Sequence, residues 1–161
     1  MIGFSGKTGT LAFELIDLDD PAQVEFSFAA KRDALGPYVK ERWGRWDDEE
    51  QRKSHRVNLG IGETYIIFSE GEAVGTIALR QAEADLHLDG FYIVPNYQGR
   101  GLGSAVLERL LAYARSEGTS VLLRHFKWNP VGGLYRRHGF EVTGESENHY
   151  WLRWSPSPLL S

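Results

Sequence analysis

The residues whose types and spacing most directly suggest chemistry form a glycine-rich loop near the middle of the chain. The loop runs Gln98-Gly99-Arg100-Gly101-Leu102-Gly103 and is followed by Ser104. Residues 86–94 before it alternate between apolar and polar side chains, and residues 104–115 after it carry apolar side chains at helical spacing. The first turn of a helix leaves backbone N–H groups unpaired, and glycines remove the Cβ atoms that would keep an anion away from them. The pattern therefore predicts a diphosphate-binding site between a strand and a helix.

The glycine spacing argues against two common nucleotide sites. A dinucleotide fingerprint requires Gly-x-Gly-x-x-Gly, whereas the third glycine here comes one position early. A triphosphate-binding loop requires Gly-Lys-Ser/Thr, and the one such triplet, at residues 6–8, needs an upstream glycine where Met1 stands. A nucleotide-binding protein of another fold is therefore disfavoured.

The loop resembles the acetyl-coenzyme A signature of the GNAT superfamily of N-acetyltransferases, Gln/Arg-x-x-Gly-x-Gly/Ala. The approach to the loop, residues 92–97, is also similar to that family. A second resemblance lies downstream, where Asn129, Tyr135, Gly139 and Phe140 match the spacing Asn-x(5)-Tyr-x-x-x-Gly-Phe. Residues 131–133, Val-Gly-Gly, depart from the alanine common there, and two glycines weaken a helix by about 1 kcal/mol each.

The resemblance covers almost the whole chain and implies an α/β fold, an α+β mixed sheet in a three-layer α/β/α arrangement with splayed central strands. The implied cofactor is acetyl-CoA, with no metal, and its pantetheine arm lies between the splayed strands. The residues that the resemblance implies for cofactor binding are Phe91, Ile93, Val94, Gln98, Gly99, Arg100, Gly101, Leu102, Gly103, Ser104, Asn129 and Tyr135.

Moving an acetyl group from a thioester to an amine requires an acid, a base and polarisation of the carbonyl group. The resemblance makes Tyr135 the expected general acid toward the sulfur, with a packed aromatic as the alternative. Backbone N–H groups around Ile93 would polarise the carbonyl. Asp89 and His87 are the candidate bases on the strand before the loop, unless both simply face solvent. His125 is a further candidate, although a histidine that ends a buried strand is commonly satisfied by hydrogen bonds.

An aromatic and acidic segment supplies the candidates for amine binding. Tyr38, Trp43, Trp46 and Asp47 would form a wall with carboxylates beside it, suited to a cationic or apolar amine. The alternative is that both tryptophans pack the helices onto the sheet.

Hydrophobic periodicity and turn residues locate the elements that must position these groups. Strands are predicted at residues 11–18, 64–68, 73–81, 86–94, 120–126, 140–144 and 148–154. Helices are predicted at residues 22–35, 38–43, 47–53, 104–115 and 130–137. Asp20 and Pro21 should begin the first helix, Gly36-Pro37 should end it, and Gly139 should end the last one.

Composition predicts a single ordinary domain over residues 1–161, with a frayed tail at 155–161 that could instead lie along a partner. The chain is 42% hydrophobic and 25% charged, lacks cysteine and has a formal net charge of −4. The absence of cysteine excludes disulfides, a thiolate nucleophile and cysteine-bound zinc, and no two of the five histidines have metal-ligand spacing with an acid nearby. No long apolar run or basic leader is evident, so we expect a cytoplasmic protein that binds neither membrane nor nucleic acid.

These observations favour an acetyl-CoA-dependent N-acetyltransferase, an acyltransferase acting on a small-molecule or peptide amine. The alternative within the same fold is a non-catalytic sensor that binds acyl-CoA as a regulatory ligand. A homodimer through the last strands is possible for this superfamily.

Overall fold

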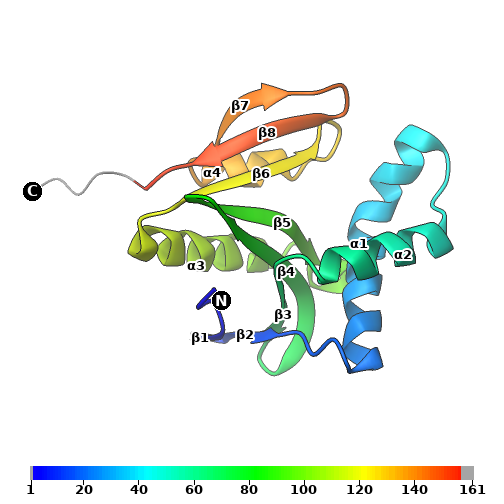
Figure 1. Cartoon of the computed structure of the whole chain (residues 1–161), viewed down its shortest axis with the longest axis horizontal. Helices are drawn as coiled ribbons and strands as arrows, with labels where there is room; N and C mark the ends of the chain where they lie inside the picture. The colour runs from blue at the N-terminus through cyan, green and yellow to red at the C-terminus, as the bar shows by residue number, and fades with distance from the viewer. Residues whose placement is uncertain (1, 157–161) are drawn as a thin grey trace, which may run out of the picture.

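The computed structural model describes residues 2–156 and shows one eight-stranded mixed sheet (Figure 1). The strands are β1 (Gly6–Thr8), β2 (Leu11–Leu15), β3 (Glu63–Ser69), β4 (Glu72–Ala82), β5 (Asp85–Ile93), β6 (Ser120–Phe126), β7 (Glu141–Glu145) and β8 (His149–Trp154). Their order in the sheet is β1-β2-β3-β4-β5-β6-β8-β7. All neighbouring pairs are antiparallel except β5 and β6, which run parallel.

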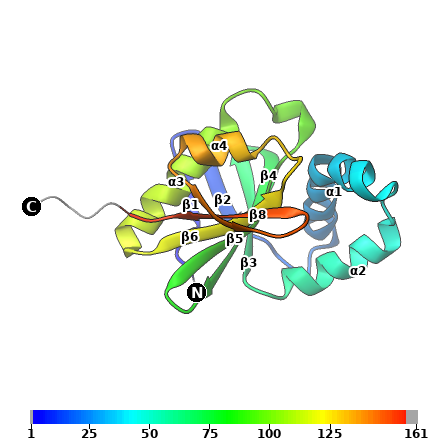
Figure 2. The ribbon, with the colours of Figure 1, turned by 90° about the horizontal axis from the view of Figure 1, so that it is seen from above.

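The helices lie on both faces of this sheet (Figures 1 and 2). They are α1 (Pro21–Trp43), α2 (Asp48–Leu59), the short 3-10 turn η1 (Pro95–Tyr97), α3 (Leu102–Glu117) and α4 (Gly132–Arg137). Side chains of β3 alternate between the faces: Tyr65 and Ile67 join the large core with α3, whereas Ile66 packs with Leu59 of α2. The predicted three-layer α/β/α architecture is confirmed.

The long helix α3 illustrates how the sequence pattern produces the core. Its buried side chains are Val106, Leu107, Leu110, Leu111 and Ala114, which form one stripe at helical spacing. This stripe packs against Leu86, Leu88 and Val121 of the two central strands in the large core. The start of α3 is therefore held at the end of β5, where the glycine-rich loop must be presented.

The prediction that Gly36-Pro37 ends the first helix is wrong, because α1 continues through both residues to Trp43. Proline inside a helix removes one backbone hydrogen bond, so packing on both sides must compensate for that loss. Gly36 is buried, and a Cβ atom there would lie 3.7 Å from the ring of Trp46. The packing of Trp46 over Gly36 therefore allows the two predicted helices, 22–35 and 38–43, to form one helix.

Other elements also differ from the prediction. The first long strand ends at Leu15 rather than at residue 18, and β1 precedes it as an unpredicted edge strand. Helix α2 extends to Leu59, six residues beyond the predicted end at residue 53. The predicted N-cap is confirmed, because the Asp20 carboxylate accepts from the Ala22 N–H at 3.0 Å. The C-cap of α4 is His138, and the predicted cap Gly139 follows it with a positive φ of 94°.

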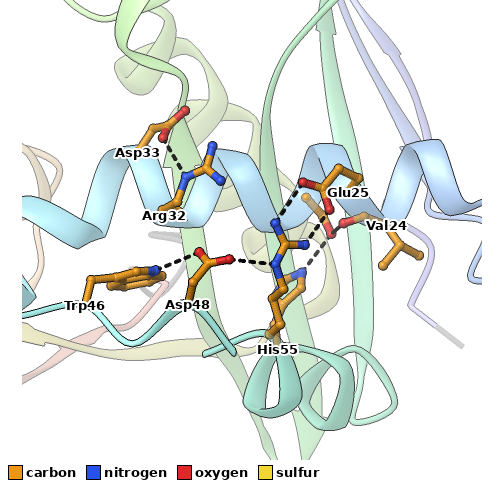
Figure 3. A network of polar contacts seen from close by, with 9 residues as sticks. Val24, Glu25, Arg32, Asp33, Trp46, Asp48 and His55 are labelled. Atoms are coloured by element: carbon orange, nitrogen blue, oxygen red, sulfur yellow. Dashed lines mark hydrogen bonds and ion pairs between the residues drawn. The ribbon is translucent and has the colours of Figure 1, made fainter. Parts of the chain in front are cut away.

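Helices α1 and α2 are joined by a polar network that Figure 3 shows from close by. The Arg52 guanidinium donates to Glu25 of α1 at 2.6 and 3.1 Å and to Asp48 of α2 at 2.8 Å. The buried Ser27 hydroxyl donates to the Val24 carbonyl oxygen at 2.7 Å and lies 2.8 Å from Nε2 of His55. This network fixes α2 against the first half of α1.

The central strands separate as the family resemblance implied. Strands β5 and β6 pair only from Asp85 to His87, opposite Ser120 to Leu122. Beyond this point β5 stays paired with β4, and β6 stays paired with β8. The facing edges of β5 and β6 therefore diverge and leave room between them.

Two remaining predictions concern the ends of the chain and membranes. Of the tail at 155–161, only Ser155 and Pro156 lie within the described residues. Among residues 2–156, none of the helices combines the length and the apolar character needed to cross a bilayer.

Candidate active site

A cavity of about 890 Å³ occupies the space where β5 and β6 diverge, and α1, the glycine-rich loop and α4 complete its walls. It brings together most of the residues singled out from the sequence. Those lining it are Tyr38, Asp89, Phe91, Ile93, Gln98, Gly99, Gly101, Gly103, Ser104, Asn129, Tyr135 and the further candidate base His125. Outside its lining are His87, Val94, Arg100, Leu102, Trp43, Trp46 and Asp47.

Strand β5 offers backbone groups to this cavity. The Val94 N–H donates to the Val74 carbonyl oxygen at 2.9 Å, so Val94 faces β4. Because hydrogen-bonding direction alternates along a strand, Ile93 and Phe91 direct their backbone groups to the opposite edge, toward β6. The Gln98 side-chain amide donates to the Ile93 carbonyl oxygen at 2.9 Å, which fixes the loop against the strand. An extended ligand can add to this edge as a strand would.

The glycine-rich loop presents the start of α3. Gly99 and Gly101 adopt positive φ angles of 77° and 79°, a backbone region that glycine enters without strain. Gly101 is the N-cap of α3 and provides no side-chain hydrogen bond to the first turn. The amides of that turn therefore remain available to a phosphate, and the helix dipole favours negative charge there. Gly103 also approaches α4 closely, since a Cβ atom would lie 3.3 Å from Leu134.

Tyr135 lies on α4 at the inner wall of the cavity and is 5% exposed. Asn129 holds the turn before this helix, because its side-chain oxygen accepts from the Val131 N–H at 3.0 Å. Burial, with a smaller contribution from Tyr92, raises the pKa of the Tyr135 hydroxyl well above its usual value. The phenol is therefore protonated at neutral pH and can act as a proton donor.

His125, at the end of β6, has one nitrogen without a partner. Its Nδ1 lies 2.7 Å from the Phe126 carbonyl oxygen, which can only accept, so Nδ1 carries the proton. Nε2 is buried and has no hydrogen-bond partner among the described residues. Burial lowers the pKa of His125, which keeps the ring neutral. A Cβ atom at Gly132 would lie 2.8 Å from this ring, so the glycine gives the imidazole its space.

The two candidate bases on β5 occupy different surroundings. Asp89 lines the cavity and accepts two hydrogen bonds from the Arg80 guanidinium, at 2.7 and 3.1 Å. It is the extra residue of a bulge, because Leu79 pairs with Leu88 and Ala78 with Gly90. His87 lies in the paired part of β5, opposite Leu122, and is not part of the lining.

The tryptophans of the acidic segment make packing contacts, although Trp43 remains 48% exposed. Trp43 contacts Phe126 and Trp128, with ring centroids 5.5 and 5.8 Å apart, and the Trp128 indole donates to the Tyr38 carbonyl oxygen at 2.9 Å. These contacts fix the end of α1 on the end of β6.

Trp46 and Asp47 stabilise the start of α2. Trp46 packs on Phe28, with ring centroids 6.2 Å apart, and its indole donates to Asp48 at 3.2 Å. Asp47 is the N-cap of α2, accepting from the Glu50 N–H at 3.2 Å.

Several lining residues were not identified from the sequence, among them Lys31, Tyr92 and Arg124. Tyr92 leans over Gly90, where a Cβ atom would lie 3.0 Å from its ring, and burial raises the pKa of its hydroxyl to about 12. Arg124 is a charged residue that directly follows the apolar run at residues 121–123, and that contrast was a signal available in the sequence. Lys31 follows no motif, and only the packing of α1 places it here.

The architecture fits coenzyme A. The open edge of β5 suits an extended pantetheine arm, and the amides at the start of α3 suit its diphosphate. Among the described residues, no group of three His, Asp or Glu side chains could hold a metal ion.

Comparison with known proteins agrees with this architecture. The model of the acetyltransferase (GNAT) family matches residues 28–140, more than half of the chain. An uncharacterised N-acetyltransferase of Methanocaldococcus jannaschii is 25% identical over 148 residues, which are 85% of this chain and 61% of that protein. A peptidyl-lysine N-acetyltransferase of Salmonella typhimurium is 34% identical over 61 residues, covering 38% of this chain and 40% of that protein. The chain thus spans less than two thirds of either relative.

Solved structures show the same fold. The PaiA N-acetyltransferase of Thermoplasma acidophilum in complex with coenzyme A superposes with a TM-score of 0.64 at 15% identity, over 90% of this chain and 98% of that one. Together with the family match, this shows that the chain belongs to the GNAT family of acetyltransferases, which use acetyl-CoA.

Proposed function

We propose that the protein transfers an acetyl group from acetyl-CoA to a primary amine of a small molecule or protein. The observation that carries this proposal is the single cavity in which the glycine-rich loop, the open edge of β5 and the Tyr135 hydroxyl meet. Acetyl-CoA supplies an acetyl group already activated as a thioester, so modest electrostatic help is enough for transfer.

The chain's own residues would hold the donor along one path. The first-turn amides of α3, at Leu102, Gly103 and Ser104, bind the diphosphate. The edge of β5 at Phe91 and Ile93 pairs with the pantetheine arm, and the Ile93 N–H lies where it can polarise a carbonyl oxygen. Asn129 keeps the turn before α4 in place, so Tyr135 stays on the opposite side of the cleft.

Tyr135 would donate its proton to the departing thiolate. Because burial raises the pKa of this hydroxyl, Tyr135 carries its proton at neutral pH and is ready to donate it. Asp89 would accept the proton of the amine, directly or through a water molecule. Arg80 holds the Asp89 carboxylate in one position at the cavity wall, and each carboxylate oxygen has a further lone pair that can accept a proton.

The proposal is tested by measuring coenzyme A release from acetyl-CoA with a panel of amines: amino acids, peptides with free N-termini or lysines, polyamines and aminoglycosides. Turnover with at least one amine, together with a rise in melting temperature on adding coenzyme A but not ATP or NAD, is the expected result. Tight coenzyme A binding without turnover on any amine would instead support a non-catalytic acyl-CoA sensor.

A further inference from the structure

The acceptor half of the cavity carries more positive than negative charge once ion pairs are taken into account. Lys31 of α1 and Arg124 of β6 both line it, and neither forms an ion pair within residues 2–156. The two carboxylates in the lining already form ion pairs: Asp33 with Arg32 at 3.1 Å, and Asp89 with Arg80 at 2.7 Å. Two cations in this half therefore lack a partner.

Lys31 belongs to a stripe of α1 that faces the cavity. Ala34, Leu35 and Tyr38 line the same cavity from positions three, four and seven residues farther along the helix. Asn58 of α2 joins this wall, and the His55 ring of α2 is near enough for the two groups to interact electrostatically. Lys31 is half-buried, and burial lowers the pKa of its ammonium group. A half-buried ammonium without a counter-ion is costly, and an anionic ligand would relieve that cost.

Arg124 is an exposed residue on the same side of the sheet as α1. It lies two residues before Phe126, which packs on Trp43 of α1, so both side chains project from the α1 side of β6. Its guanidinium lies 5.5 Å from the centre of the Trp151 ring, a contact that leaves its hydrogen-bond donors available. Two titratable groups lie close enough to interact with it, Tyr92 and His149. Burial lowers the pKa of His149, which disfavours a third positive charge there.

The cofactor phosphates would have cationic and dipolar partners of their own on the opposite side of the cavity. Arg137 also lines the cavity without an ion pair in residues 2–156, but it lies on α4, and its Nη1 is 3.3 Å from where a Cβ of the neighbouring Gly133 would lie. With the start of α3, it can serve the phosphates. Lys31 and Arg124 lie on the α1 side of the sheet, away from that end.

Resting on the proposed function, we infer that the acceptor is an amine that also carries a carboxylate, which Lys31 and Arg124 bind. An amino acid or a peptide with an acidic group near its free amine has this chemistry, whereas a polyamine or an aminoglycoside would be repelled. The transfer step is unchanged: the amine nitrogen forms the amide bond, the carbon–sulfur bond breaks, and the proton lost by the amine balances the one gained by the thiolate.

The first experiment compares each carboxylate with its amide: glycine with glycinamide, phenylalanine with phenylalaninamide, and peptides ending in an acidic or an amidated residue. We expect wild-type kcat/KM to favour the carboxylates by about tenfold or more, as expected for hydrogen bonds to charged groups. In Lys31→Met and Arg124→Gln this preference should fall through a higher acceptor KM, with coenzyme A binding unchanged. The matched controls Lys40→Met and Arg56→Gln remove exposed cations outside the cavity and should retain it.

A binding measurement separates this inference from the proposed function. With coenzyme A present, N-acetylated carboxylates should raise the melting temperature of the wild type more than their amides do, and Lys31→Met should abolish the difference. That result supports the inference even if the tested amines give no turnover, which would count only against the proposed function. The inference would be overturned if the wild type acetylated amides or diamines as well as carboxylates. It would also be overturned if both variants bound coenzyme A more weakly.

Discussion

The imidazole of His125 stacks on the phenol ring of Tyr135, with ring centroids 6.2 Å apart and planes 26° from parallel. Phe140 contacts the same phenol edge-on at 5.5 Å. The proposed acid is therefore held between the end of β6 and Phe140, which directly precedes β7. Its orientation depends on packing, because its hydroxyl has no hydrogen-bond partner among the described residues.

Gly132→Ala should destabilise the protein and displace this stack. The new methyl group would lie 2.8 Å from His125, whose ring is confined by Tyr135 and Tyr150 and cannot move aside. Overpacking of this kind costs about 1–3 kcal/mol in the free energy of unfolding, measured by denaturant titration. Gly133→Ala is the matched control, since its methyl group would meet only the end of the flexible Arg137 side chain at 3.3 Å. Equal stability of the two variants would show that the His125 ring is not confined.

Tyr135→Phe should bind coenzyme A as tightly as the wild type and turn over at least about tenfold more slowly, a barrier increase of roughly 1.4 kcal/mol. Removing the hydroxyl keeps the aromatic stack but deletes the proton donor. Steady-state kinetics and coenzyme A titration check the two parts separately. Tyr113→Phe, which removes a hydroxyl on α3 outside the cavity, should keep full turnover. Full activity in Tyr135→Phe would leave Tyr135 as a packed aromatic.

The strands other than β1, the loop and the two cofactor motifs could be predicted because they depend on local patterns. Alternation predicted β5, helical spacing predicted α3, and the resemblance to the GNAT family implied the divergence of β5 from β6 that the structure confirms. The stack of His125 on Tyr135 could not be predicted in this way, since it joins two elements whose relative position only tertiary packing determines.

A local rule also misled on α1. A glycine followed by proline is a strong helix-ending signal, yet Trp46 packs over Gly36 and α1 continues. Asp47 was a candidate for the acceptor site as a carboxylate beside the aromatic wall. Its spacing to Glu50 was equally the pattern of an N-cap, which is the role it has in the structure.

Asp89→Asn should lower kcat by about tenfold or more, because a positioned general base contributes at least that much. The amide keeps the shape of the carboxylate and loses its basicity, so the KM for acetyl-CoA should not change. Asp85→Asn is a matched control on the same strand, also paired with an arginine, at 3.4 Å from Arg153, and outside the cavity. Measuring kcat for both variants as a function of pH checks this prediction. An unchanged rate in Asp89→Asn would mean that the amine reaches the site already neutral.

His55 of α2 contacts the Ser27 hydroxyl of α1 in the buried part of the network shown in Figure 3. The Ser27 hydroxyl proton is donated to Val24, so Ser27 must accept from the Nε2–H of His55. Burial, and then Lys31, lower the pKa of His55 from 6.5 to about 4. Between these two values the unfolded chain binds a proton at this residue and the folded chain does not, so the free energy of unfolding decreases as the pH falls.

His55→Gln should remove this dependence. The wild type should lose about 1.4 kcal/mol of unfolding free energy per pH unit from this residue as the pH falls from 6.5 toward 4, in addition to the contribution of the carboxylates. The glutamine variant keeps an N–H donor for Ser27 but cannot bind the extra proton, so its stability should fall less steeply over the same range. Denaturant titrations of both proteins at pH 8, 6 and 4.5 measure the two slopes. Parallel curves would mean that His55 binds its proton equally well in the folded and unfolded chains.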